Sequence, residues 1–368
     1  MSLILNRRRL IQVSSSALIL GALNSTSGPA SAQSSKELRV TLYGGDTGKA
    51  NIEAYVKPFQ TSTGINVSPI TDDATLSQIE LMVTTKNVTV DVCGLDAVSA
   101  HIAASKGYLE EIDYSIYKKE NIDGLVEICR KPFGVSGLFY SVLTFYNTEK
   151  FKAGGPQPTS WADLWDVAKF PGIRTLESGA WGTEGPWEEA LLADGVAPDA
   201  LYPMDVDRVF ASLDKIKPHV RKWWESGSEN QQMIRDQAAE LGSCYDGRAQ
   251  VLIDEGVPIA INRNRAKLFC DYWVIPKGSP NVQNAQKFIE FATRADRQAE
   301  FGKLVAFGPT NLEAYKMMPQ EVGAKLTSYP DYMANSIPVN IEWYTQVGSD
   351  GLTNNERLMQ RWNEWILR

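Results

Sequence analysis

The stretch Phe269-Cys270-Asp271-Tyr272-Trp273-Val274-Ile275-Pro276 carries the most information about the fold. It has the composition of an apolar strand, with a single acidic residue among aromatic and β-branched neighbours. A second stretch, Cys244-Tyr245-Asp246-Gly247-Arg248, also runs from an apolar strand edge into a charge beside an aromatic residue. Strand ends are where an α/β fold exposes its ligand-binding groups. The two stretches therefore predict an α/β fold with a pocket where these strands end.

Arg248 and Asp271 are the candidate charged residues of this pocket. The guanidinium of Arg248 offers a rigid fork of donors for a carboxylate, and Asp271 offers an acceptor for an ammonium group. Tyr245 and Phe269 would cover the apolar middle of a ligand that carries both charges. The alternative is that each charge is a solvated residue at a strand end, or that the two pair with each other.

The first half of the chain alternates between strand and helix patterns. We expect strands at 37–43, from 64 onward and at 88–93, and helices at 51–60 and 75–85. This alternation predicts a largely parallel sheet with ligands bound beyond the strand ends. Tyr43 and Leu95 are then candidates for the pocket rim, and the alternative places each in a loop or in the core.

Further along, residues 133–147 predict a long strand that passes from one lobe to another, with Phe139 near the cleft. Residues 179–186 form a glycine-rich entry to a helix, which leaves backbone N–H groups free for an anion and makes Trp181 a candidate wall of the site. A plain loop with a buried tryptophan is the alternative. Helices are also expected at 205–216, before Pro218, and at 285–293.

Length and composition agree with a globular protein of two lobes. The chain has 368 residues, of which 43% are hydrophobic and 22% charged, so it can bury a sizeable core and is not disordered. The net charge of −7 argues against a nucleic-acid partner. His101 and His219 lie far apart in sequence, and we expect neither a metal site nor a cofactor.

Residues 1–32 have the features of a cleaved export signal. Arg7-Arg8-Arg9 precedes an apolar run, and Ala30-Ser31-Ala32 supplies a small-x-small cleavage site before Gln33. The arginines also resemble a twin-arginine signal, while Asn6 and Gln12 depart from it, so the general secretory route stays open. With no cysteine near the cleavage site, we expect a soluble protein of the periplasm rather than a lipoprotein.

The four cysteines favour disulfides in an oxidising compartment. We expect the pairs Cys93–Cys129 and Cys244–Cys270, one in each predicted lobe. The alternative is four buried thiols.

The order of segments resembles the periplasmic solute-binding proteins of polyamine (spermidine/putrescine) ABC importers. The sequence segments that carry this resemblance begin at residue 37. Each segment alone is a weak indicator of the family, but their order and spacing are specific. They are Glu37–Gly45, Phe59–Val67, Thr159–Trp165, Tyr245-Asp246-Gly247 and Trp273-Val274-Ile275-Pro276.

The resemblance implies roles for individual residues. In that family an acidic residue just before the Ile-Pro pair holds a ligand ammonium, and Asp271 matches it. The position of Arg248 is small and neutral in the polyamine binders, and a second glutamate of theirs falls near Gly185, so one cation partner is expected to be lost and an anion partner gained. Tyr344 matches a segment whose side chains reach the ligand.

These observations predict a non-enzymatic binding protein of the two-lobed type II periplasmic fold, with the ligand cleft between the lobes. The first lobe would comprise 33–141 and 274–322, and the second 142–273 and 323–368. One guanidinium and one carboxylate predict a small zwitterionic ω-amino acid, with γ-aminobutyrate (GABA) of the related branch as the best match. The expected partner is an ABC permease in the inner membrane, and the protein is expected to be a monomer.

Two alternatives remain at this point. A polyamine binder would need a second carboxylate in the cleft, such as Asp46, Asp96 or Asp246. A periplasmic hydrolase is a function of another class, but the sequence has no Gly-x-Ser-x-Gly motif and only two histidines.

Overall fold

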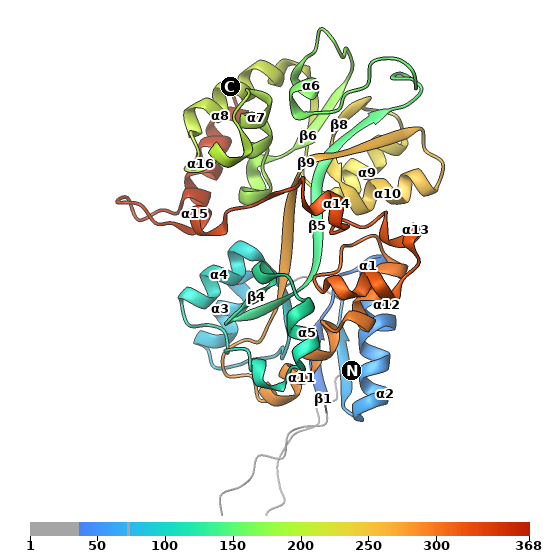
Figure 1. The fold of residues 1–368 in the computed structure, drawn as a ribbon. Coiled ribbons are helices and arrows are strands. Elements are labelled where there is room, and N and C mark those ends of the chain that lie inside the picture. The colour runs from blue at the N-terminus through green and yellow to red at the C-terminus, as the bar shows by residue number, and fades with distance from the viewer. Residues whose placement is uncertain (1–36, 72–73) are drawn as a thin grey trace, which may run out of the picture. The chain divides into compact units, whose positions relative to one another are not determined.

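Two long antiparallel strands, β5 (Gly134–Asn147) and β9 (Ile259–Val274), form the centre of the fold (Figure 1). The computed structural model describes residues 37–71 and 74–368, so the predicted export signal at 1–32 lies outside the described residues. One end of this strand pair, at Val135 and Trp273, packs in one hydrophobic cluster, and the other end, at Phe145 and Ile259, packs in another. The strand predicted at 133–147 is confirmed.

Most other strands extend the sheet around this pair. An eight-stranded sheet has the order β10-β9-β5-β8-β6-β7, with β3 paired to β9 and β4 to β5, and a two-stranded parallel sheet joins β1 to β2. These strands are β1 (Glu37–Thr41), β2 (Asn66–Ile70), β3 (Cys93–Asp96), β4 (Arg130–Lys131), β6 (Arg174–Glu177), β7 (Val220–Trp224), β8 (Leu241–Tyr245) and β10 (Ile337–Pro338). The fold is therefore mixed α/β, with both parallel and antiparallel pairs.

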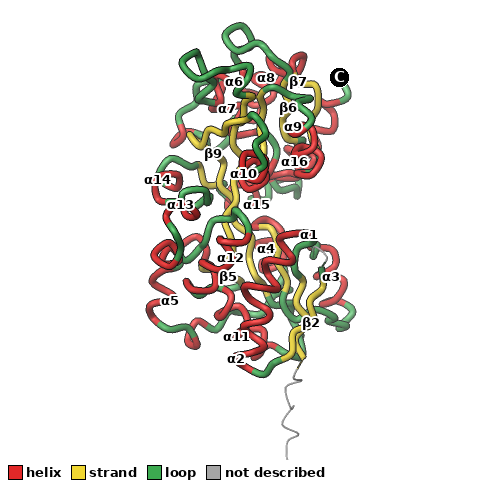
Figure 2. The backbone as a smooth tube through the Cα atoms, turned by 90° about the vertical axis from the view of Figure 1, so that its right-hand side faces the viewer, coloured by secondary structure: helices red, strands yellow, loops and turns green. Residues whose placement is uncertain are grey.

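The helices lie outside the strands (Figure 2). The α-helices are α1 (Gly45–Asn51), α2 (Lys57–Thr63), α3 (Leu76–Thr84), α4 (Ala97–Ser105), α5 (Lys119–Gly124), α6 (Trp161–Trp165), α7 (Trp187–Ala193), α8 (Val206–Ile216), α9 (Gly227–Arg235), α10 (Asp246–Asp254), α11 (Val282–Ala292), α12 (Ala295–Leu304), α13 (Gln320–Gly323), α14 (Pro330–Met333), α15 (Ile341–Thr345) and α16 (Asn354–Ile366). The segment η1 (Ile52–Val56) is a π-helix. The 3₁₀ segments are η2 (Tyr114–Ile116), η3 (Glu127–Cys129), η4 (Gly179–Glu184), η5 (Pro198–Ala200), η6 (Lys217–His219) and η7 (Leu312–Met317). Within the described part of the chain, no helix is both long and apolar enough to cross a bilayer.

Local sequence signals explain several element boundaries. The helix predicted at 75–85 is α3, which begins with a capping box between Thr75 and Gln78. The helix predicted at 51–60 is longer than expected, because α1, η1 and α2 are continuous from residue 45 and end at Gly64, whose φ of 69° suits glycine. The strand predicted at 88–93 was wrong over most of its length. Asp91 instead binds the side chain and backbone of Arg39, and β3 begins only at Cys93.

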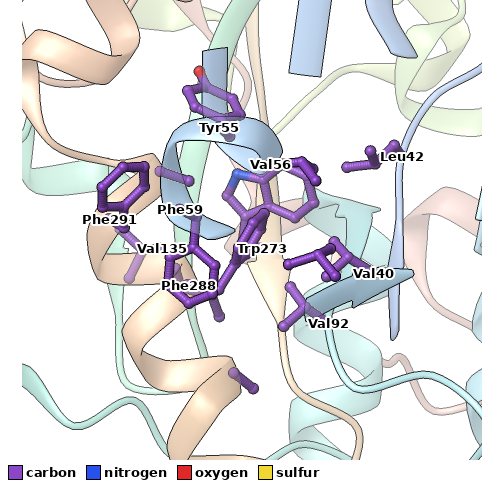
Figure 3. Packing of buried hydrophobic residues seen from close by; sticks show 14 of the residues in the cluster. Val40, Leu42, Tyr55, Val56, Phe59, Val92, Val135, Trp273, Phe288 and Phe291 are labelled. Atoms are coloured by element: carbon purple, nitrogen blue, oxygen red, sulfur yellow. The ribbon is translucent and has the colours of Figure 1, made fainter. Parts of the chain in front are cut away.

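A hydrophobic cluster fixes the end of β9 (Figure 3). The Trp273 ring meets the edge of Phe288 at 6.1 Å, and Phe288 in turn meets Phe59 at 5.3 Å. All three side chains are at most 4% exposed. Edge-to-face aromatic pairs of this kind add to the stabilisation from area burial. The packing of Trp273 therefore anchors strand β9 two residues after Asp271.

The predicted disulfides are not present. All four cysteines are free and buried. Cys244 lies on β8 opposite Leu143, whereas Cys270 lies on β9 opposite Phe139, with β5 between the two strands. Two strand spacings amount to roughly 9–10 Å, which exceeds the reach of a disulfide. The pairing of Cys244 with Cys270 is therefore wrong.

The pairing of Cys93 with Cys129 is wrong as well. Both residues belong to one core cluster, but the thiol of Cys129 lies within hydrogen-bonding reach of Cys270 instead. Burial raises the pKa of the Cys93 thiol to about 12, which makes it a poor nucleophile for disulfide exchange. The alternative of buried thiols fits the structure.

The structure predicts four titratable thiols per chain in protein that is denatured without reductant. Because no covalent bridge constrains the unfolded state, adding a reductant should leave the midpoint of thermal unfolding unchanged. A thiol titration in denaturant, paired with thermal melts with and without dithiothreitol, checks both statements. Two or fewer titratable thiols would contradict the free-cysteine arrangement.

Candidate functional site

A cavity of about 540 Å³ opens beside the middle of β5 and β9. Its lining comes from the segment after β1 and the start of α1, from β5, η4, the end of β8, the start of α10 and β9, and from Phe307. The lining residues are Tyr43, Gly44, Gly45, Thr47, Leu138, Tyr140, Glu184, Tyr245, Asp246, Gly247, Arg248, Asp271 and Phe307. Four of the residues predicted from sequence, Tyr43, Tyr245, Arg248 and Asp271, are thus brought together.

Asp271 is partly buried on one wall of this cavity. It pairs with Leu138 of β5, and its Oδ2 accepts a hydrogen bond from the Tyr43 hydroxyl over 2.6 Å. Its other carboxylate oxygen, Oδ1, is buried and has no hydrogen-bond partner among the described residues. Burial raises the pKa of Asp271 to about 7, against the hydrogen bond from Tyr43, which lowers it. The carboxylate is therefore poised to accept a proton or a cationic donor.

Glu184 supplies a second carboxylate to the same cavity. It is the last residue of η4, and its two oxygens accept hydrogen bonds from the hydroxyls of Tyr140, at 2.9 Å, and of Tyr245. Burial raises its pKa, while the two tyrosine hydrogen bonds lower it. Tyr140 also stacks on Phe269 with ring centroids 5.1 Å apart. An aromatic group thus holds this carboxylate in place.

Arg248 lies in the first turn of α10, directly after β8, and its side chain is exposed. One guanidinium nitrogen, Nη1, donates to Gln231 over 3.1 Å. Among the described residues Arg248 forms no ion pair, so the two predicted charges do not pair with each other. Arg248 lines this cavity and an adjoining one. The cavity is therefore lined by a cation as well as by the carboxylates of Asp271 and Glu184.

The other predicted site residues lie outside the lining. Phe269 lies behind Tyr140 and lines a separate cavity of about 90 Å³. Leu95 and Phe139 are buried in a core cluster, since Phe139 points to the opposite face of β5 from Tyr140. Tyr344 is buried and donates to Glu188 over 2.6 Å. Trp181 is 56% exposed on η4.

Sequence reasoning missed Glu184 and Tyr140. It placed the second glutamate of the family near Gly185 and treated it as lost, although Glu184 is the adjacent residue. Considering the residues on either side of Gly185 in the sequence would have identified Glu184. The expectation of a single carboxylate in the cavity is therefore corrected, because Glu184 and Asp246 line it together with Asp271.

Of the three carboxylates named for a polyamine site, Asp246 lines this cavity, and Asp46 and Asp96 do not. Asp46 is exposed and pairs with Lys49, and Asp96 caps α4. Asp246 lines the cavity, but its oxygens accept from the backbone of Ser141 and from Arg263 and Thr327. Residues 37–71 and 74–368 contain no group of three or more His, Cys, Asp or Glu side chains that could hold a metal ion.

Residues 54–334 match the family model described as bacterial extracellular solute-binding protein. The chain is 32% identical over 341 residues to the gamma-aminobutyric acid-binding protein of Pseudomonas aeruginosa, covering 91% of this chain and 92% of that one. It is 26% identical over 312 residues to the spermidine/putrescine-binding periplasmic protein of Escherichia coli, covering 81% and 86% of the two chains.

The fold has a close counterpart among solved structures. A structure described as a GABA receptor superimposes with a TM-score of 0.80 at 33% identity, covering 89% of this chain and 97% of that chain. The architecture is therefore that of the type II periplasmic binding proteins, as the sequence predicted.

The raised pKa of Asp271 predicts a pH-dependent stability of the ligand-free protein. A carboxyl group whose pKa is higher in the folded state contributes stability that is present below the ordinary pKa and is lost as the pH rises through about 7. Asp271→Asn should therefore raise the free energy of unfolding by about 1–3 kcal/mol at pH 8, with a smaller gain at pH 5. Urea unfolding at both pH values, in buffers free of amines, measures this difference.

The matched control for this experiment is Asp254→Asn. Asp254 is an exposed residue of α10 that pairs with Lys325, so its loss should change stability by less than about 1 kcal/mol. An Asp271→Asn variant that is no more stable than the parent at pH 8 would show that the carboxylate is not strained by burial.

Proposed function

The chain belongs to the bacterial extracellular solute-binding proteins, and on that premise we propose that it captures a small ω-amino acid, best matched by GABA, for an ABC importer. Members of this family are non-enzymatic, which removes the hydrolase alternative. The observation that carries the proposal is that one cavity is lined by the guanidinium of Arg248 and by the carboxylates of Asp271 and Glu184.

The amine end of the ligand would lie against Asp271 and Glu184. The Oδ1 atom of Asp271 is buried without a partner in the described residues, and an ammonium group would supply the missing donor. Burial raises the pKa of Asp271 to about 7, so the ligand-free pair carries less than two full charges near neutral pH. A single ammonium group therefore suffices to compensate it.

The carboxylate end of the ligand would lie against Arg248, whose planar fork suits bidentate binding. The ring of Tyr140 and the side chains of Leu138 and Phe307 offer apolar contact for the methylene groups between the two ends. This division into charged ends and an apolar middle favours a ligand with separated charges over an α-amino acid. The similarity to a GABA-binding protein over 91% of the chain supports the same choice.

A polyamine is the second candidate ligand, and one observation favours it. Glu184 provides the second carboxylate that a diamine would need, one residue before Gly185, near which the sequence analysis expected that carboxylate to be lost. Against it, one ammonium of a bound diamine would approach the guanidinium of Arg248, and like charges in a closed site cost several kcal/mol. The identity to the spermidine/putrescine-binding relative is also lower and covers less of the chain.

The proposal includes the two lobes, 33–141 with 274–322 and 142–273 with 323–368, which would close over the ligand. Closure excludes water, and charge pairs are stronger where water is excluded. The liganded form would be delivered to an inner-membrane permease by a monomer in the periplasm, after export by either the twin-arginine or the general secretory route.

Calorimetric titration decides between the two ligand classes. We expect GABA to bind more tightly than its neighbours in chain length, and more tightly than putrescine or spermidine by about 100-fold. The titrations should be made at pH 8, where Asp271 is ionised. Tighter binding of putrescine or spermidine than of GABA would show that the protein is a polyamine receptor.

The role of Arg248 is tested by Arg248→Ala. Loss of a charged bidentate contact should weaken GABA binding by about 100-fold or more and leave putrescine binding unchanged or stronger. Arg235→Ala is the matched control, because Arg235 is an exposed arginine of the neighbouring helix α9 that pairs with Glu255 outside the cavity. Unchanged GABA affinity in Arg248→Ala would remove Arg248 from the site.

A further inference from the structure

A buried lysine lies behind the amine end of the cavity. Lys267 of β9 is 1% exposed, and its ammonium donates to the backbone carbonyl of Gly185 over 2.6 Å. The same ammonium donates to Glu189 over 3.0 Å and to Glu188 over 3.2 Å, both in the first turn of α7. None of these four residues, Lys267 included, lines the cavity. The lysine therefore has no direct part in the site described above.

The carboxylates around Lys267 outnumber it. Glu177 joins Glu188 and Glu189 in this cluster, and both Glu177 and Glu189 have a buried Oε1 atom without a hydrogen-bond partner in the described chain. Burial raises the pKa of each of these two groups, while the charge of Lys267 lowers it. Burial alone would lower the pKa of Lys267, but the surrounding carboxylates raise it above its ordinary value. The lysine is thus held as a cation.

The contact with Gly185 connects this cluster to the cavity. Gly185 follows Glu184 directly, at the point where η4 gives way to α7. The turn is also held by Trp187, whose ring nitrogen donates to the carbonyl of Gly182 over 2.6 Å. A displacement of the Gly185 carbonyl would therefore move the Glu184 carboxylate.

Lys267 and Asp271 are four residues apart on one strand. Successive side chains of a strand point to opposite faces, so residues 267, 269 and 271 share a face. The continuous register with β5, from Leu138 opposite Asp271 to Val142 opposite Lys267, keeps this alternation intact. Strand β9 therefore carries both Asp271, one proposed carboxylate partner of the amine, and Lys267. Lys267 contacts the turn that carries Glu184, the other proposed carboxylate partner.

We propose that Lys267 is a positioning residue for the amine end of the cavity: by binding the Gly185 carbonyl, it sets the place of the Glu184 carboxylate relative to Asp271. The inference rests on the proposed function, because it assigns Lys267 a part in ligand binding. Its ammonium also favours the ionised form of Glu184. The competing explanation is that Lys267 only neutralises the buried glutamates of α7.

The first test needs no ligand. Lys267→Met keeps the length of the side chain and removes its charge, and the Glu184 carboxyl can be followed by carbon-13 NMR, with its signal assigned by its loss in Glu184→Gln. The pKa of Glu184 should rise in Lys267→Met, because the charge of Lys267 lowers it in the parent. The other groups that face Glu184 stay unchanged in this comparison, and they are Tyr140 of β5, Tyr245 of β8, Asp96 of β3 and Asp271 of β9. An unaltered pKa would overturn the proposal.

The second test is a double-mutant cycle on GABA affinity. Lys267→Met should weaken binding by about tenfold in the parent and by less than about twofold in the Glu184→Gln background, because the lysine acts through that carboxylate. Equal losses in both backgrounds would show that the role is only structural and would overturn the proposal.

A second variant controls for the possibility that Lys267→Met impairs folding. Lys267→Met combined with Glu189→Gln removes both members of the closest buried pair, which costs less stability than removing one. The same weakening of GABA binding and the same rise in the Glu184 pKa are expected from it. A parent protein that binds no GABA would refute the proposed function, while the NMR titration would still decide the role of Lys267.

Discussion

The antiparallel pairing of β5 with β9 is the constraint on which the site depends. It places Leu138 opposite Asp271 and Tyr140 opposite Phe269, while Tyr245 of β8 lies opposite Val142. A shift of the β5–β9 register by one residue would turn Asp271 to the opposite face of the sheet, where Cys270 now packs in the core. The aromatic cluster around Trp273 fixes the end of β9, so core packing and ligand chemistry are specified by the same strand.

The electrostatics of the cavity follow from this arrangement. Two partly buried carboxylates face one space, each with hydrogen bonds from tyrosine hydroxyls, and neither forms an ion pair with a cation of the described residues. Such a site costs stability in the ligand-free protein, because burial disfavours the charged form. A cationic ligand restores that stability when it binds. Under the proposed function, the protein therefore exchanges part of its own stability for affinity toward an amine.

The sequence predicted the fold well because its signals were local. The run of aromatic and β-branched residues at 133–147 predicted β5, and the helices predicted at 75–85 and 205–216 are α3 and α8. Partner choice across the sheet was harder, since the cysteines were paired by position along the chain while β5 separates the strands of Cys244 and Cys270. Glu184 was missed because its role arises from a turn and from two tyrosines distant in sequence. Tyr43, Tyr245, Arg248 and Asp271 were found because a charge or an aromatic ring at a strand end is visible in sequence.

The central claim is that one cavity binds the two opposite charges of a single small molecule. The most direct test is a crystal structure of the protein with GABA. We expect the ligand nitrogen at about 3 Å from carboxylate oxygens of Asp271 and Glu184, and the ligand carboxylate within hydrogen-bonding distance of the Arg248 guanidinium. A ligand bound with its nitrogen away from both carboxylates, or outside this cavity, would contradict the claim.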